Sequence, residues 1–128
     1  MDSKTHSAIT RWLAHNMPDV AATLVRMLTP EVIAGIAQKE AICGPYTVNI
    51  EELQGPITAI KFYVMSAGDS LMLAVAPTIK GAPDTDRPQL SFNFFFMVED
   101  FPNEIGNEEN CANLVDDLVK QCEESPYL

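Results

Sequence analysis

Residues 60–76 read IKFYVMSAGDSLMLAVA, and this stretch decides the fold class. Apolar side chains recur at every second position on both sides of the short connection Ala67-Gly68-Asp69. The inward positions are Ile60, Phe62 and Val64 before the connection and Leu71, Leu73 and Val75 after it. A period of two is typical of a β-strand with one buried face, and a short connection containing Gly favours a hairpin. We therefore predict two adjacent antiparallel strands.

One further strand is predicted upstream of this hairpin. Tyr46, Val48 and Ile50 alternate with more polar residues, which indicates a strand with one wet face. The pair Gly44-Pro45 precedes it and is expected to close the helical region, because both residues interrupt regular structure. Downstream, residues 77–88 read PTIKGAPDTDRP, and three prolines with a glycine predict a long irregular loop.

The last predicted strand, residues 89–98 (QLSFNFFFMV), is unusually apolar. Five apolar side chains are expected to share one face: Leu90, Phe92, Phe94, Phe96 and Val98. The other face changes partway from polar Ser91 and Asn93 to apolar Phe95 and Met97. These two apolar residues lie on the face that should contact water. We therefore predict that they are covered, either by the same chain or by another subunit.

Helices are predicted at both ends of the chain. Residues 3–39 should form three helical segments separated at Pro18 and Pro30, since proline in a first turn removes only an N–H group without a partner. Thr29 is the expected N-cap of the third segment. A final helix over 107–123, capped by Asn107, presents apolar residues at intervals of three and four. The expected fold is one α+β domain over 1–128: N-terminal helices (3–39), a four-stranded antiparallel meander (46–98) and a C-terminal helix packed on the sheet.

Composition excludes several function classes. The 128 residues are 47% hydrophobic, which favours a folded core, and they carry a net charge of −10, which disfavours contact with nucleic acid or anionic lipid. We expect no membrane span, since no stretch approaches the roughly 20 apolar residues that one requires, and no secretory signal. Three unpaired cysteines (Cys43, Cys111 and Cys122) favour reduced thiols in the cytoplasm.

No motif for catalysis or metal binding stands out. The only histidines, His6 and His15, lie in the first helix away from any nucleophile motif. No C-x-x-C spacing is present, and Asp84 with Asp86 lacks the later ligands of a calcium loop. Phosphate-binding glycine loops are absent as well. We expect no catalytic residue, no metal and no cofactor.

The charge is unevenly distributed. Residues 99–128 carry a net −8, whereas residues 1–50 are neutral. An acidic helix is commonly no more than a solvated surface, but it can also attract a basic protein. The candidate partner-binding residues are therefore the two apolar side chains of the last strand and the acids of the last helix: Phe95, Met97, Glu108, Glu109, Asp116, Asp117, Glu123 and Glu124.

In size, charge and layout the chain resembles the secretion chaperones of bacterial injection systems, which dimerise and bind extended segments of their clients. It differs in having three predicted helical segments before the first strand and no helix between strands. The resemblance includes no motif, so no residue role is transferred from it.

Three function hypotheses follow. The first is a non-enzymatic protein-binding module, for example an acidic adaptor, chaperone or inhibitor that binds a basic protein partner and can form a homodimer through its sheet. The second is a small-ligand binder or enzyme with an apolar pocket lined by Phe62, Tyr63, Phe94 and Phe96. The third is a structural subunit of a larger assembly.

Overall fold

The computed structural model describes residues 1–83, 90, 92 and 94–128. Within these residues the elements are α1 (Ser3–Met27), α2 (Pro30–Ala37), β1 (Ile42–Asn49), η1 (Glu51–Leu53), β2 (Ile57–Ala67), β3 (Ser70–Ile79), β4 (Phe94–Met97), η2 (Val98–Asp100), α3 (Phe101–Ile105) and α4 (Glu108–Glu123). The sheet order is β1-β2-β3-β4, and every neighbouring pair is antiparallel. The predicted α+β fold, with N-terminal helices, a four-stranded meander and a C-terminal helix, is confirmed.

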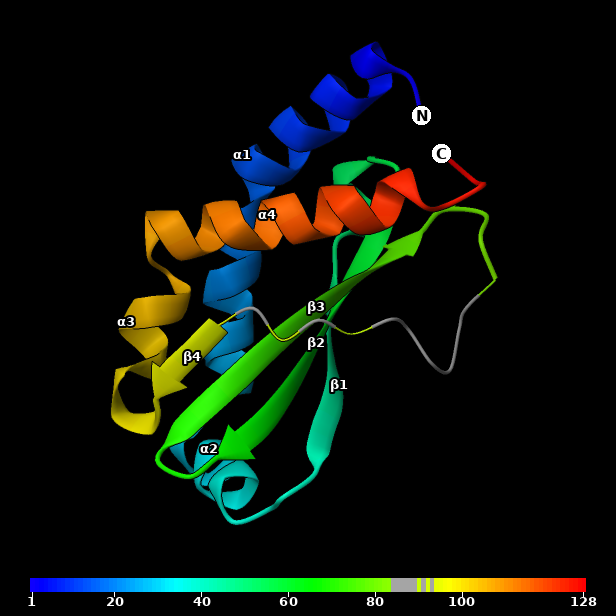
Figure 1. Cartoon of the computed structure of the whole chain (residues 1–128). Coiled ribbons are helices and arrows are strands. Elements are labelled where there is room, and N and C mark those ends of the chain that lie inside the picture. The colour runs from blue at the N-terminus through cyan, green and yellow to red at the C-terminus, as the bar shows by residue number, and fades with distance from the viewer. Residues whose placement is uncertain (84–89, 91, 93) are drawn as a thin grey trace.

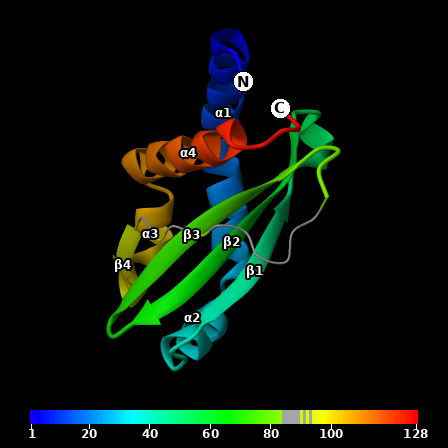
Figure 2. The same ribbon diagram turned by 45° about the vertical axis from the view of Figure 1, so that its right-hand side comes forward.

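The helices gather on one face of the sheet, here called the inner face. Helix α1 runs behind the strands and α4 crosses it, as both views show (Figures 1 and 2). Helix α4 also contacts β3, and α2 contacts β2 near the β2–β3 turn. The opposite face, here called the outer face, is turned toward the viewer in Figure 1 and has no helix over it.

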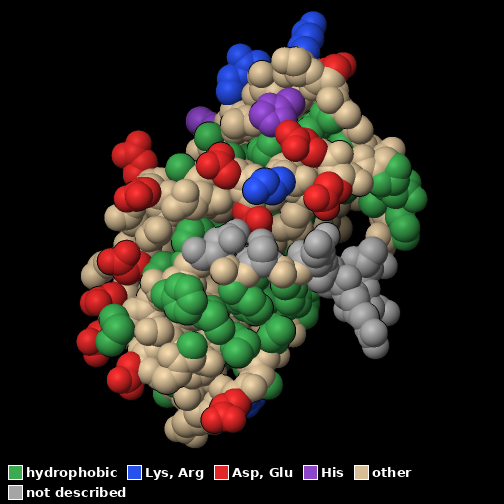
Figure 3. Space-filling model, viewed as in Figure 1, with side chains coloured by type: hydrophobic (Ala, Val, Ile, Leu, Met, Phe, Trp, Pro, Cys, Tyr) green, Lys and Arg blue, Asp and Glu red, His purple; other side chains and the backbone are tan. Residues whose placement is uncertain are grey.

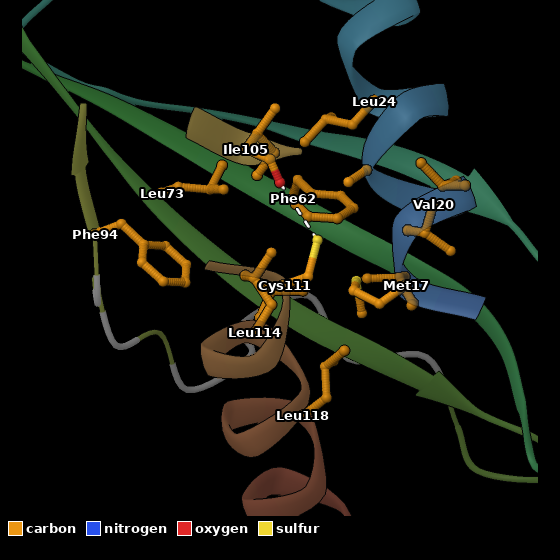
Figure 4. Close-up of a cluster of buried hydrophobic side chains, with 14 of the residues drawn as sticks. Met17, Val20, Leu24, Phe62, Leu73, Phe94, Ile105, Cys111, Leu114 and Leu118 are labelled. Atoms are coloured by element: carbon orange, nitrogen blue, oxygen red, sulfur yellow. Dashed lines mark hydrogen bonds between the residues drawn. The ribbon is translucent and has the colours of Figure 1, made fainter. Parts of the chain in front are cut away.

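The core fills the space between the inner face and the helices. Phe62 from β2 lies at its centre, surrounded by Leu24 of α1, Leu73 of β3 and Leu114 of α4, all fully buried (Figure 4). Burial of each such side chain contributes about 1.5–3 kcal/mol relative to an exposed one. This packing fixes the position of the sheet, so its outer face is rigidly supported.

Helix α1 is longer than predicted, because Pro18 lies inside it and does not end a segment. Apolar residues from the first two predicted segments form one buried stripe: Ile9, Leu13, Met17, Val20, Ala21 and Leu24. Proline inside a helix costs about 3 kcal/mol, and burial of the continuous stripe offsets this cost. Nearby, the Asn16 amide donates a hydrogen bond of 2.8 Å to the Trp12 carbonyl.

Strand β1 begins earlier than predicted, and Gly44-Pro45 lies inside it instead of before it. The pairing with β2 shifts register between Cys43 and Tyr46, which marks a bulge. Gly44 has φ 123°, and a Cβ there would lie 2.6 Å from the Phe62 carbonyl oxygen. The glycine therefore permits the bulge. At the other end, Ile50 falls outside the strand and precedes η1.

The predicted β2–β3 hairpin is confirmed, with Ala67 opposite Ser70 across the turn. Gly68 in this turn has φ +67°, a left-handed conformation that glycine adopts without strain. Strand β3 continues to Ile79, so the first three residues of the predicted 77–88 loop belong to the sheet. Residues 84–88 of that predicted loop, including Asp84 and Asp86, lie outside the described residues.

The predicted strand 89–98 is wrong in extent and in facing. In the described residues the strand covers Phe94–Met97, and Val98 begins η2. Phe94 and Phe96 pack in the inner core, but Leu90 and Phe92 pack against Tyr63, Ala74 and Ala76 on the outer face. The predicted positions Gln89, Ser91 and Asn93 lie outside the described residues.

In the described residues β4 pairs with β3 as far as Leu73, and helix α4 contacts the β3 edge just beyond this point. The Gln121 side-chain amide of α4 donates a hydrogen bond of 2.6 Å to the Val75 carbonyl of β3. A carbonyl bonded to α4 is not available to a neighbouring strand, because backbone groups in a sheet need these same bonds. Of the residues before Phe94, Leu90 and Phe92 pack on the outer face.

Both predicted caps are confirmed. The Thr29 hydroxyl accepts a bond from the Val32 N–H at the start of α2, and the Asn107 side chain accepts bonds from the Glu109 and Asn110 N–H groups at the start of α4. Helix α3 was not predicted. It is a single short segment that buries Phe101 and Ile105, and the Cys111 thiol lies 3.5 Å from the Ile105 carbonyl (Figure 4).

Candidate protein-binding face

The outer face carries a continuous row of large apolar side chains that crosses all four strands. Ile42 of β1 lies opposite Met65 of β2, Met65 lies opposite Met72 of β3, and Met72 lies opposite Phe95 of β4. Side chains at directly paired positions lie on the same face, about 4.5–5.5 Å apart at Cβ. We call these four residues the outer row.

The two ends of the outer row are strongly exposed. Phe95 is 68% exposed and Ile42 is 50% exposed, while Met65 and Met72 between them are half-buried. Met97, two residues beyond Phe95 on the same face, is 44% exposed and lies opposite Ser70. Hydrophobic side chains gather on this face below the segment drawn in grey (Figure 3).

Part of the outer face is covered by the chain itself. Leu90 and Phe92 pack against Tyr63, Ala74 and Ala76, which are all buried. The two alanines leave room over β3 that the larger side chains fill. The outer row lies next to this covered area along β2 and β3, with its two ends exposed and its two methionines half-buried.

Single exposed apolar residues are normal on protein surfaces, whereas a contiguous apolar patch marks an interaction site. The outer row differs from the other exposed apolar side chains because its members are paired across strands. Leu53, at 44% exposure, lies in η1 outside the sheet and serves as a comparison. Methionine adds adaptability, since its flexible thioether fits partners of varied shape.

The inner core holds the outer row in place. On β4, exposed Phe95 and Met97 alternate with buried Phe94 and Phe96. The Phe96 ring meets the Phe101 ring edge-on, with centroids 5.7 Å apart, so the strand is anchored from behind. Because these buried rings fix the orientation of β4, Phe95 and Met97 stay on the outer face.

The predicted partner-binding acids belong to a different part of the surface. Five of them lie on α4 and Glu124 is its C-cap; all are exposed except half-buried Asp117. Helix α4 packs on α1 and β3 through its apolar side. Phe95 and Met97 instead lie on β4, facing out from the sheet. The structure therefore joins the two predicted apolar residues to the outer row and leaves the acids on a separate helix.

Two of these acids have specific neighbours within the protein. The Gln121 amide donates a hydrogen bond of 3.1 Å to Asp117 Oδ2, which helps to hold the glutamine against β3. Glu123 Oε1 lies 2.9 Å from His6 Nε2 of α1, and both side chains are partly exposed. His6, which lies in the first helix as predicted, therefore contacts α4 through Glu123.

The two thiols buried in the core are poor nucleophiles. Cys43, Cys111 and Cys122 are all free, and the last two are buried. Burial raises the pKa of the Cys122 thiol to about 11 and also raises the pKa of the Cys111 thiol. A thiol that stays protonated is a poor nucleophile. Within the described ranges, no group of three or more His, Cys, Asp or Glu side chains could hold a metal ion.

The four aromatic residues proposed to line a ligand pocket do not share one space. Phe62, Phe94 and Phe96 are buried in the inner core, whereas Tyr63 faces the outer side beneath Phe92. Two cavities lie elsewhere. One, of about 460 Å³, lies between the start of α1 and residues 54–56, beside Trp12. The other, of about 530 Å³, lies between residues 37–40 and 65–68, beside Met65.

Three members of the outer row were missed from the sequence. Ile42 precedes the predicted first strand, and Met65 and Met72 read as ordinary alternation within the hairpin. The available signal was the residue type, because the outward positions 63, 65 and 72 hold Tyr and Met where a wet face would carry polar residues. Their alignment depends on strand register, which no local pattern specifies.

Comparison with known proteins gives no match: no family model, no curated protein and no solved structure matches this chain. In the part of the chain that the structure describes, no single helix is long and apolar enough to span a membrane. Helices α1 and α2 meet that test only as a pair, which is bent by 79°.

Proposed function

We propose that this protein is a non-enzymatic protein-binding module that uses the outer row and Met97 as its contact surface. The observation that supports this proposal is the pairing of Ile42, Met65, Met72 and Phe95 into one apolar row across the sheet, exposed at both ends. Exposed apolar surface on a rigid support is the usual centre of a protein interface, because its burial removes apolar area from water. The free thiols suit a reducing compartment, and we place the protein in the cytoplasm.

The chemistry of the surface supports binding over catalysis. The outer row itself contains no titratable group, and the charged residues at its ends, such as Glu99 and Lys39, are exposed on the surface. General acid–base or nucleophilic catalysis needs a titratable group within reach of the substrate. The outer row instead offers an apolar surface against which a partner's apolar side chains can be buried.

A capture experiment with matched variants tests the proposal. The wild-type protein, Phe95→Thr and Leu53→Thr are immobilised and exposed to an extract of the cells that make the protein. Threonine keeps the strand preference of position 95 and removes the ring. We expect a partner that the wild type and Leu53→Thr retain and that Phe95→Thr loses. Equal retention by all three proteins would contradict the proposal.

A sedimentation measurement separates a partner of another sequence from a second copy. If the wild type is monomeric at the concentrations used for capture, the outer row is free to bind another protein. A dimer that Phe95→Thr dissociates would show that the row binds its own copy.

A further inference from the structure

We infer that the occupant of the outer row is a segment of another protein whose apolar side chains are flanked by Lys or Arg. This inference rests on the proposed function and specifies the chemistry of the partner. It is carried by the charges at the two ends of the row, which are separate from the acids of α4.

The end of the row at β4 is bordered by three exposed acids. Glu99 and Asp100 follow Met97 directly in η2. Asp69 lies in the β2–β3 turn, where its carbonyl accepts a hydrogen bond of 3.3 Å from the Val98 N–H. The turn and the end of β4 are thus joined, and the three carboxylates lie at one end of the patch. In Figure 3, acidic side chains follow the left and lower border of the hydrophobic area.

The other end of the row has one acid and one base. Exposed Lys39 and Glu40 precede Ile42 and help to line the cavity of about 530 Å³ that Met65 also lines. Lys61 shares the outer face but stands four residues from Met65 along β2, about 13 Å away at the rise of a strand. Among the residues that the structure describes, the immediate border therefore has four acids and one base, a net charge of −3.

This border favours a basic partner over a second copy. Two copies that met through the row with their β4 ends together would bring three acids of each chain face to face. In the opposite orientation these acids would face one lysine and one glutamate, and each chain carries a net −10. Like charges brought together across an interface oppose binding, whereas opposite charges increase the rate of encounter and select the partner. Lys or Arg next to the apolar side chains of the occupant would meet Asp69, Glu99 and Asp100.

The geometry of the row limits the size of the occupant. Four strands are separated by three steps of about 4.8 Å, so the row is about 14 Å long. That length corresponds to about four residues in an extended segment or about nine in a helix. A short linear segment is therefore sufficient to cover it.

Two synthetic peptides test the inference. Both carry the same apolar sequence, one flanked by lysines and the other by glutamates, and binding is followed by fluorescence anisotropy at low and high salt. We expect the wild type to bind the lysine peptide at least about tenfold more tightly, with the ratio falling as salt increases. Phe95→Thr should weaken the binding of both peptides.

Two triple variants with the same charge change locate the effect. One neutralises the border (Asp69→Asn, Glu99→Gln, Asp100→Asn), and the other neutralises three acids of α4 and its C-cap (Glu108→Gln, Asp116→Asn, Glu124→Gln). The preference for lysine should disappear in the border variant and persist in the α4 variant. Circular dichroism of both variants checks that they fold.

Several results would overturn the inference. These are equal affinity for the two peptides, no binding of either, loss of the preference in the α4 variant alone, or a wild-type dimer that Phe95→Thr dissociates. The proposed function fails in a different way, when Phe95→Thr leaves capture of the cellular partner unchanged. A partner lost in Phe95→Thr but without preference for lysine flanks would leave the proposed function standing and remove the inference.

Discussion

Phe95 lies directly opposite Met72 across the β3–β4 ladder, on the face of the sheet that no helix covers. The next residue back, Phe94, points to the opposite face and is buried among the helices. Two adjacent phenylalanines therefore have opposite roles, one in the fold and one on the surface. This separation allows the surface to be altered without loss of the core.

The two phenylalanines should respond very differently to truncation. Phe94→Ala is expected to lower the free energy of unfolding by about 3–5 kcal/mol, because it leaves a cavity in the core. Phe95→Ala should lower it by about 1 kcal/mol or less, since the side chain is exposed. Urea denaturation of both variants measures the difference. Similar losses for the two would mean that Phe95 is also a core residue.

Gln121 should stabilise the edge of the sheet. Gln121→Ala removes the hydrogen bonds to the Val75 carbonyl and to Asp117, and we expect a loss of about 1–2 kcal/mol in the free energy of unfolding. Lys120→Ala, one position earlier and exposed, is the control and should change it by less than about 0.5 kcal/mol. Amide hydrogen exchange in β3 should accelerate in the Gln121 variant; unchanged exchange there would count against this role.

Gly55 is required for the position of Trp12. A Cβ at residue 55 would overlap the Trp12 ring, so Gly55→Ala must displace the indole. Trp12 is the only tryptophan, and its fluorescence emission should shift to longer wavelength as the ring becomes more exposed. Gly35→Ala is the matched control, because nothing lies within 4 Å of the new Cβ. It should stabilise α2 by about 0.5–1 kcal/mol without changing the emission.

Stability should fall at alkaline pH partly through Cys122. Burial raises the pKa of its thiol to about 11 in the folded protein, from 9.0 for an exposed thiol. Below pH 9 both states hold the proton, and this contribution to stability is fully present. Between pH 9 and 11 the unfolded chain loses the proton first, so the free energy of unfolding falls by up to about 1.4 kcal/mol per pH unit.

Cys122→Ala isolates this effect. The variant is expected to be less stable at pH 7 because of the cavity, but its deficit relative to the wild type should shrink as the pH rises from 9 to 10.5. Denaturant unfolding at several pH values provides the measurement. A deficit that stays constant over this range would show that the thiol does not titrate differently in the two states.

Features encoded by a few adjacent residues were predicted well. The hairpin around Gly68 follows from alternation and a short turn, and the caps Thr29 and Asn107 follow from side chains that bond to the next backbone N–H groups. Each of these signals is complete within about ten residues. They also fixed the order of helices and strands.

Features that depend on distant residues were missed. Pro18 remains in a helix because a stripe that begins at Ile9 is buried along its whole length, and the hydrogen bond to the β3 edge comes from Gln121 of a distant helix. The outer row requires the register of three strand pairs at once. Phe95 and Met97 were found because their own strand is anomalous, whereas Ile42 and Met72 become conspicuous only beside their partners.

The methionine methyl groups provide the most direct test of the outer row. The protein has six methionines: Met65, Met72 and Met97 on the outer face, Met17 in the core, Met27 exposed on α1, and Met1. With labelled methyl groups, nuclear magnetic resonance can follow all six while the lysine-flanked peptide is added. We predict shifts at Met65, Met72 and Met97, with Met17 and Met27 unchanged. Unchanged outer-face methyls, or shifts centred on Met27, would contradict the account.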